Sequence, residues 1–219
     1  MTTPIFPAAV LWDMDGTILD SEPYWMAEET RLVEQAGGTW STEEATELVG
    51  SDLNHSAAAL LERTPVTGSS DDIVNALLDG VVTRVKERVP WRPGARELIA
   101  ELSEAKVPMA LVTMSWQPLA EVLLDALPPS TFAAVVTGDQ VSDGKPHPEP
   151  YLLACRRLEV QPSDCLAIED SPTGVRSALA AGVRTLAVSH MVDVDAELPA
   201  ARRDSLEGVR LHDLRGLFG

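Results

Sequence analysis

Short apolar segments alternate with helical patterns from about residue 90 to the end of the chain. Such alternation predicts a parallel sheet that is covered by helices on both faces. We therefore expect a Rossmann-like α/β domain with a sheet of about five strands. Five apolar segments have the length of buried strands: residues 8–12, 108–113, 133–136, 165–168 and 184–188.

The first of these segments is separated from the others by a stretch that contains helical patterns alone. Four amphipathic helices are expected in this stretch, residues 21–88, where Ser21 and Ser70 provide capping side chains for the first and the fourth. The sequence therefore predicts a core domain, residues 1–20 and 89–219, into which an all-helical cap domain is inserted.

Composition limits the kinds of partner that this chain can have. Its 219 residues are 45% hydrophobic, which is enough for one full domain and a smaller one. The formal net charge of -17 argues against nucleic-acid and membrane partners, because both require a basic face. No apolar run approaches the ~18 residues of a membrane span. With Cys155 and Cys165 too few for a disulfide framework, we expect a cytoplasmic protein, and a monomer.

Polar side chains follow four of the predicted strands. Because the carboxyl ends of parallel strands meet at one edge of a sheet, a single pocket could hold all of these side chains. Four carboxylates, one ammonium and one hydroxyl suit a hard, oxygen-ligated cation such as Mg²⁺, and an anionic substrate could bridge the cation and the ammonium. The residues are Asp13 and Asp15, Thr113, Lys145, and Glu169 with Asp170.

Each of these residues also has a structural interpretation when it is taken alone. Thr113 could cap a helix, Lys145 could be a solvated charge, and Glu169 with Asp170 could form an N-terminal capping cluster. Their joint occurrence in this order favours a functional site, because chance agreement falls as independent motifs accumulate.

Together the motifs resemble the haloacid dehalogenase superfamily, specifically its phosphatase and phosphomutase branch with a helical cap inserted after the first motif. The resemblance covers nearly the whole chain. It implies a Mg²⁺-dependent hydrolase that acts on a small phosphorylated metabolite through an aspartyl phosphate. The four motifs are Asp13-Met14-Asp15-Gly16-Thr17, Thr113 after an apolar strand, Lys145 in Gly-Lys-Pro, and Glu169-Asp170-Ser171.

The resemblance also implies a role for each motif residue. Asp13 is expected to be the nucleophile and Asp15 the general acid and base. Lys145 and the Thr113 hydroxyl are expected to balance charge on the transferred phosphoryl group. The expected magnesium ligands are Asp13, the backbone carbonyl of Asp15, Asp170, and Glu169 directly or through water.

Substrate recognition is expected to lie mainly in the cap. Ser21, Trp25, Gly50 and Ser51 are the candidate cap residues for binding the substrate. In the core, Met114 follows Thr113 where a small or polar residue is more usual in the family. Contacts to substrate at Met114 are therefore expected to use its backbone N–H.

The residues present favour a phosphatase over three other activities found in this superfamily. A β-phosphoglucomutase carries a histidine twelve residues past the nucleophile and an arginine three residues past the cap glycine, where this chain has Trp25 and Leu53. A dehalogenase lacks the second aspartate, which is present here as Asp15. A phosphonate hydrolase needs a cap lysine for Schiff-base chemistry, and Lys86 lies at the far end of the cap.

A non-catalytic binding protein on the same fold is a further alternative. Loss of the nucleophile would indicate such a protein. Asp13 is present, so the sequence favours a phosphatase.

Overall fold

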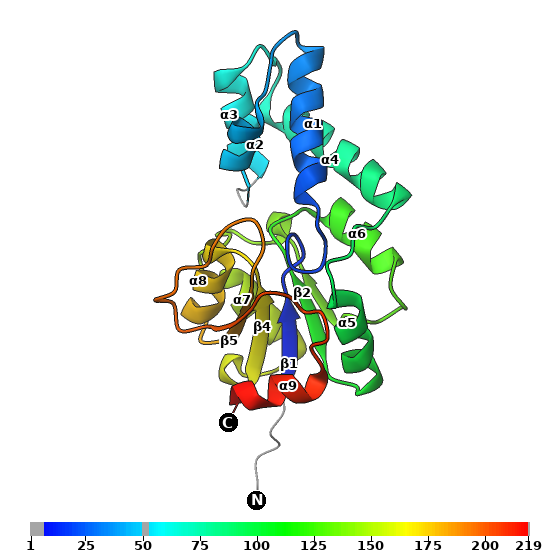
Figure 1. Cartoon of the computed structure of the whole chain (residues 1–219), viewed down its shortest axis with the longest axis vertical. Helices are drawn as coiled ribbons and strands as arrows, with labels where there is room; N and C mark the ends of the chain where they lie inside the picture. Colours follow the sequence, from blue (N-terminus) through cyan, green and yellow to red (C-terminus); the bar gives the residue numbers. More distant parts are fainter. Residues whose placement is uncertain (1–6, 50–52, 219) are drawn as a thin grey trace, which may run out of the picture.

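A parallel sheet forms the centre of the computed structural model, which describes residues 7–49 and 53–218. Within these ranges the sheet has six strands in the order β3-β2-β1-β4-β5-β6. Four helices stand beyond the end of the sheet toward which β1 points (Figure 1). The strands are β1 (Ala9–Trp12), β2 (Met109–Val112), β3 (Ala134–Val136), β4 (Cys165–Glu169), β5 (Arg184–Val188) and β6 (Ala201–Arg203).

Helices make up most of the rest of the described chain. Those beyond the sheet are α1 (Glu22–Gln35), α2 (Thr42–Glu47), α3 (Leu53–Arg63) and α4 (Ser70–Glu87). Those beside the sheet are α5 (Ala95–Glu104), α6 (Gln117–Asp125), α7 (Glu149–Leu158), α8 (Pro172–Ala180) and α9 (Leu211–Arg215). Short 3₁₀ turns occupy Gly138–Gln140, Pro162–Asp164 and Gly216–Phe218.

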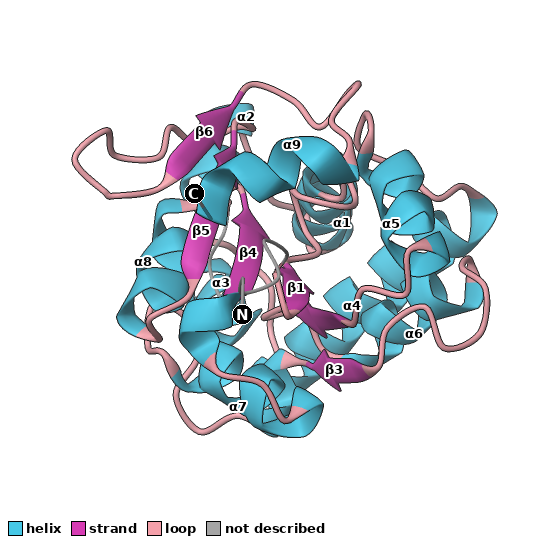
Figure 2. Ribbon diagram, turned by 90° about the horizontal axis from the view of Figure 1, so that it is seen from below, coloured by secondary structure: helices cyan, strands magenta, loops and turns pink. Residues whose placement is uncertain are grey.

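Burial on both faces explains the apolar runs that predicted the strands. Val10 and Trp12 of β1 face a core that includes Leu98 of α5 and Leu123 of α6. The alternate residue Leu11 packs in a second core with α7 and α8. Figure 2 shows α7 and α8 on one side of the sheet and α5, α6 and α9 on the other. A strand buried on both sides has no polar face, so its sequence is continuously apolar.

The sixth strand, β6, was not among the five expected from the sequence. It pairs in parallel with β5, from Leu186 opposite Ala201 to Val188 opposite Arg203. Arg202 and Arg203 are exposed, so β6 has no apolar run that could have predicted it. Its position depends on backbone pairing at the edge of the sheet.

Helix α4 belongs to two hydrophobic cores. Its first half contributes Ile73 and Leu77 to the core of the helical region, together with Val33 and Leu60. Its second half contributes Leu78, Val81 and Val85 to the main core beside the sheet. The helix therefore joins the helical region beyond the sheet to the main hydrophobic core along its length.

The structure differs from both predictions of a serine that caps the start of a helix. Ser69, and not Ser70, is the N-cap of α4: its hydroxyl accepts from the Asp72 N–H at 3.2 Å, and Asp72 accepts from the Ser69 N–H at 3.0 Å. Ser21 stands at the N-cap position of α1 but makes no side-chain capping bond. Its hydroxyl donates to Asp15 instead.

Hydrogen bonds join the two chain segments that connect cap and core. The Asp20 N–H donates to the Pro90 carbonyl at 2.7 Å, and the Arg92 N–H donates to the Ile18 carbonyl at 2.8 Å.

Cys155 and Cys165 are buried free thiols. Within the described ranges, none of the helices has the length and apolar character needed to span a bilayer.

Candidate active site

The turn after β1 brings the first motif against the end of β4. The Asp13 N–H donates to the Ile168 carbonyl at 3.0 Å, which continues the β1–β4 pairing by one residue. Gly16 then adopts φ +83°, and a Cβ at this position would lie 2.0 Å from Asp170 Oδ2. Only glycine both adopts this positive φ readily and leaves room for the Asp170 carboxylate. The Thr17 hydroxyl completes the contact by donating to Asp170 Oδ1 at 3.2 Å.

Lys145 is a buried ammonium whose donors are all engaged. Its Nζ lies 2.6 Å from Asp13 Oδ1, 2.6 Å from Glu169 Oε1 and 2.9 Å from the Val112 carbonyl. Burial by itself would lower the pKa of Lys145, but the charges of Asp13 and Glu169 outweigh it and hold the pKa above its usual value. Lys145 therefore stays charged and fixes one oxygen of Asp13.

No described residue donates a hydrogen bond to the other oxygen of Asp13. This atom, Oδ2, is buried. Burial, followed by the negative charge of Glu169, raises the pKa of Asp13 to about 8, although Lys145 opposes the shift. The pKa of Asp170 is also well above its usual value, through burial and then the charge of Asp13. The site therefore holds more carboxylate charge than Lys145 can balance.

This excess charge fits a divalent cation. One oxygen each of Asp13, Glu169 and Asp170 lies within 4.8 Å of the others. Of these three carboxylates, Glu169 is the least available to bind a cation directly. Its Oε1 accepts from Lys145 and from the Tyr151 hydroxyl at 2.9 Å, and its Oε2 accepts from two backbone N–H groups and the Ser171 hydroxyl.

Gly174 of α8 makes room for the Glu169 carboxylate. A Cβ at residue 174 would lie 1.7 Å from Glu169 Oε1 and 2.0 Å from its Cδ. This carboxylate can move only by breaking its bonds to Lys145 and Tyr151. The position of Lys145 therefore depends on the absence of a side chain at residue 174.

We expect Gly174→Ala to reduce the free energy of unfolding by about 1–3 kcal/mol, the usual cost of overpacking. Thermal unfolding measures this change. Gly216→Ala is the matched control, because a Cβ at residue 216 would meet nothing within 4 Å. Equal stability of the two variants would contradict the expectation.

Hydroxyl groups hold both oxygens of Asp15. The Ser21 hydroxyl donates to Asp15 Oδ1 at 2.5 Å, while Ser115 and Thr113 donate to Oδ2 at 2.7 and 3.2 Å. The Thr113 hydroxyl also accepts from the Ser115 N–H at 3.0 Å. Thr113 thus positions Asp15 in this structure.

A cavity of about 580 Å³ lies between the core residues and the helices beyond the sheet. Among the residues predicted from sequence, Asp13, Asp15, Trp25, Thr113, Met114, Lys145 and Asp170 line it. Met114 has a further contact, because its Sδ accepts from the Lys145 N–H at 3.2 Å. Ser21 and Glu169 are completely buried behind the lining. Gly50 and Ser51 lie outside the described residues.

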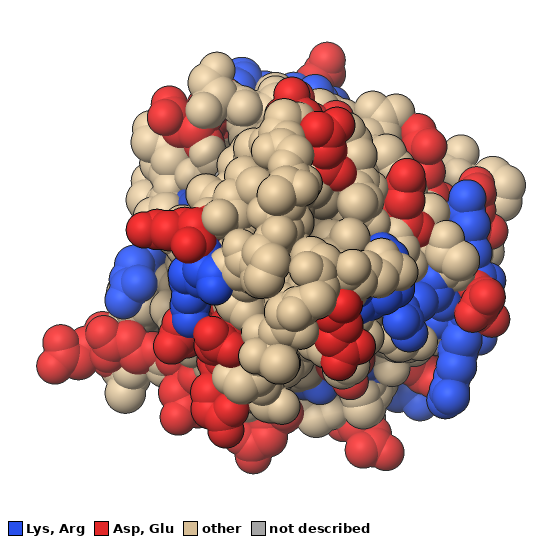
Figure 3. Space-filling view, turned by 90° about the horizontal axis from the view of Figure 1, so that it is seen from above, with Lys and Arg blue, Asp and Glu red and all other residues tan. Residues whose placement is uncertain are grey.

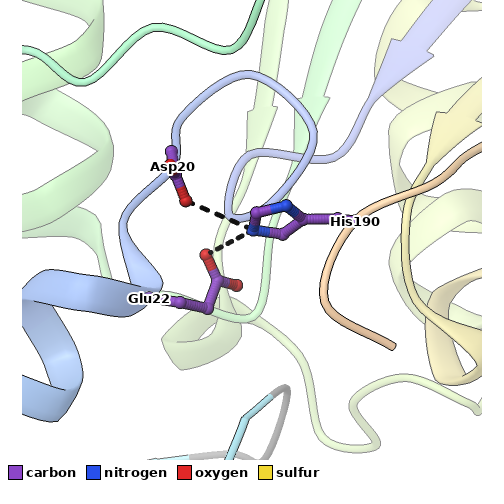
Figure 4. A group of neighbouring side chains, drawn as sticks. All are labelled: Asp20, Glu22 and His190. Atoms are coloured by element: carbon purple, nitrogen blue, oxygen red, sulfur yellow. Dashed lines mark hydrogen bonds and ion pairs between the residues drawn. The ribbon is translucent and has the colours of Figure 1, made fainter. Parts of the chain in front are cut away.

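His190 connects the loop after β5 to the start of α1 (Figure 4). Its Nε2 lies 3.3 Å from Asp20 Oδ1 and 3.3 Å from Glu22 Oε2. The next residues, Met191 and Val192, line the cavity. No sequence spacing indicated this contact, because His190 is 168 residues from Glu22. The contact ties the residues on either side of Ser21 to the core.

The comparison with protein families agrees with this arrangement. The family model described as haloacid dehalogenase-like hydrolase matches residues 10–188, which include all four motifs. The chain belongs to this hydrolase family.

Relatives of this haloacid dehalogenase-like hydrolase include a curated phosphatase. Hexitol phosphatase A of Escherichia coli (strain K12) is 34% identical over 191 residues, covering 84% of this chain and 83% of the relative. A solved structure of mutant CbbY from Rhodobacter sphaeroides, in complex with xylulose-(1,5)bisphosphate, has a TM-score of 0.86 at 29% identity, covering 95% of this chain and 99% of that chain.

The fold extends to the phosphomutases. The structure of β-phosphoglucomutase from Clostridium difficile has a TM-score of 0.80 and covers 96% of each chain, at 22% identity. That likeness shows that the two proteins share a fold.

Sequence reasoning missed several residues of this hydrolase that support the site. Ser115 and Tyr151 donate to Asp15 and Glu169, but nothing in their sequence context distinguishes them from other polar residues. Glu29 lines the cavity from α1 although it lies on the buried face of that helix. A glutamate at a buried helical position was the available signal.

Proposed function

We propose that this chain is a Mg²⁺-dependent phosphatase that hydrolyses a small phosphate monoester through an aspartyl phosphate on Asp13. The observation that carries the proposal is the environment of Asp13. One of its oxygens is fixed by Lys145, the other accepts no hydrogen bond from the described residues, and Asp13 lines a cavity that Asp15 also lines. We further propose that the protein acts as a monomer in the cytoplasm on a phosphorylated metabolite, and that nucleic acids and membranes are not its partners.

In the first step a carboxylate oxygen of Asp13 attacks phosphorus, and the bond from phosphorus to the substrate oxygen breaks. Protonated Asp15 gives its proton to the departing oxygen, so the product is an alcohol. In the second step Asp15 removes a proton from water as that water attacks phosphorus, and the bond between phosphorus and the Asp13 oxygen breaks. Inorganic phosphate leaves, and both aspartates return to their starting states.

The metal requirement is supported by the charge of the cavity. Lys145 is the single Lys, Arg or His among the described residues that line it, and its three protons are already donated. Asp13, Asp170 and the Asp15 backbone carbonyl would hold Mg²⁺, with Glu169 acting through water because of its existing bonds. When bound, the ion supplies positive charge that balances the carboxylates and the phosphoryl oxygens.

The proposal is tested by incubating the purified protein with glucitol 6-phosphate or p-nitrophenyl phosphate. We expect release of inorganic phosphate that EDTA abolishes and added Mg²⁺ restores. Absence of release from either compound in the presence of Mg²⁺ would favour the alternative of a non-catalytic binding protein.

A sugar phosphomutase is the alternative enzyme. Trp25 and Leu53 line the cavity at the positions where the mutase carries histidine and arginine. Arg63 is the first arginine after Leu53 in the sequence. It pairs with Glu47 at 2.9 Å and stacks over Trp40. These observations favour the phosphatase. With β-glucose 1-phosphate and a trace of the 1,6-bisphosphate, ³¹P NMR should show inorganic phosphate; faster formation of glucose 6-phosphate would indicate the mutase.

A further inference from the structure

Three glutamates lie on the buried face of α1, and they differ in how their charge is balanced. Glu28 lies 2.6 Å from Arg31 and 2.6 Å from Arg84. Glu22 lies 3.3 Å from His190. Glu29 has no cationic partner among the described residues. A buried carboxylate without a cationic partner is costly, so its presence in this helix calls for a physical reason.

Hydrogen bonds from the described residues reach only one of the two Glu29 oxygens. The residue is 4% exposed, and the Trp40 indole N–H donates to its Oε2 at 3.2 Å. No hydrogen bond from the described residues reaches Oε1. Glu29 lines the same cavity as Asp13, so its side chain can contact a molecule that is bound there.

The cap side of this cavity carries no positive charge in its described lining. Its polar lining residues are Glu22, Glu29, Asn54 and Ser56, and the rest are apolar or aromatic. Figure 3, which looks down on the cap, shows basic side chains interspersed among acidic ones on the outer surface. A second phosphate or a carboxylate on the substrate would therefore meet Glu29 without a counter-charge.

We propose that Glu29 is a specificity-determining residue, which accepts a hydrogen bond from a substrate hydroxyl at the end remote from the phosphate and rejects substrates with a second anionic group there. The substrate class is then the uncharged polyol or sugar monophosphate. This inference rests on the proposed phosphatase function and adds the residue that recognises the rest of the substrate.

The environment of the carboxyl group agrees with recognition of a neutral hydroxyl. Burial raises the pKa of Glu29 to about 7, although the bond from Trp40 opposes the shift. A group that exchanges its proton near neutral pH can accept from a hydroxyl or donate to one. Such a carboxyl group carries less negative charge than an ordinary glutamate, so it suits a neutral hydroxyl better than a substrate ammonium group.

Kinetics with two substrates test the proposal. Glucitol 6-phosphate carries distal hydroxyls, and p-nitrophenyl phosphate carries none. We expect Glu29→Leu to lower kcat/KM for glucitol 6-phosphate by about 10- to 100-fold, the loss of one hydrogen bond to a charged group, and to change p-nitrophenyl phosphate less than about threefold. Glu29→Gln, which keeps an acceptor, should lose less. Glu34→Leu, on the exposed side of α1, is the matched control.

Binding measurements separate this proposal from the phosphatase assignment. Titration calorimetry on Asp13→Asn, with and without Glu29→Leu, compares glucitol 6-phosphate with inorganic phosphate and needs no turnover. Weaker binding of the polyol phosphate alone supports the role of Glu29, even if the wild type hydrolyses nothing. Equal losses of affinity for both ligands, or no loss for either, would overturn the role of Glu29. A preference for glucosamine 6-phosphate over glucose 6-phosphate that Glu29→Leu removes would also overturn it.

Discussion

Replacing Asp13 with asparagine is expected to reduce turnover more than about a thousandfold, as removal of a covalent nucleophile does in other enzymes. Asparagine is close to aspartate in shape, and its amide oxygen can still accept from Lys145. It cannot attack phosphorus effectively, because the amide is a poor nucleophile. Release of p-nitrophenol measures the loss.

The same variant should unfold no more easily than the wild type. An acid whose folded pKa is raised, as that of Asp13 is to about 8, costs stability as pH rises above its unfolded value of 3.8. Asparagine removes this cost, so its advantage should be larger at pH 8 than at pH 5. Asp125→Asn, on the surface at the end of α6, is the control. Substantial turnover by a folded Asp13→Asn protein would exclude Asp13 as the nucleophile.

Replacing Lys145 with methionine should damage both stability and activity. The side chain is 5% exposed, and its loss leaves the carboxylates of Asp13 and Glu169 buried without their shared cation. Removing one partner of such a group costs about 3–5 kcal/mol. The loss should be greatest at high pH and smaller near pH 5, because the abandoned carboxylates can take up protons there.

Chemical denaturation across this pH range measures the effect, and Lys86→Met on the exposed side of α4 is the control. Combining Lys145→Met with Asp13→Asn should recover part of the lost stability, since one of the two unbalanced charges is removed. A pH-independent loss would show that packing, and not charge, dominates at Lys145.

The strands could be predicted where both faces are buried, and not where backbone pairing alone forms them. Residues 8–12 show an apolar run because every side chain of β1 is covered. β6 has two exposed arginines and lies at the edge, so its sequence resembles a loop. The N-cap residue of α4 was predicted as Ser70, but it is the adjacent Ser69. Asp72, three residues after Ser69, completes a capping box with Ser69 and so distinguishes the two serines.

Residues of the site could be predicted when they follow strands. Asp13, Asp15 and Asp170 do so, and parallel strands place their ends together. Ser21 and Ser115 donate to Asp15, and Tyr151 donates to Glu169, through side-chain bonds whose partners are determined by tertiary packing. Ser21 is the clearest example. Its sequence context is that of a helix cap, yet its hydroxyl lies 2.5 Å from Asp15.

The position of α4 in two hydrophobic cores bears on how the molecule unfolds. Opening the core beside the sheet would uncover Leu78, Val81 and Val85, and melting the helical region would release Ile73 and Leu77 from the same helix. Neither part can lose its structure without fraying a helix that the other part needs. We therefore expect the helices beyond the sheet and the sheet itself to unfold together in one cooperative transition.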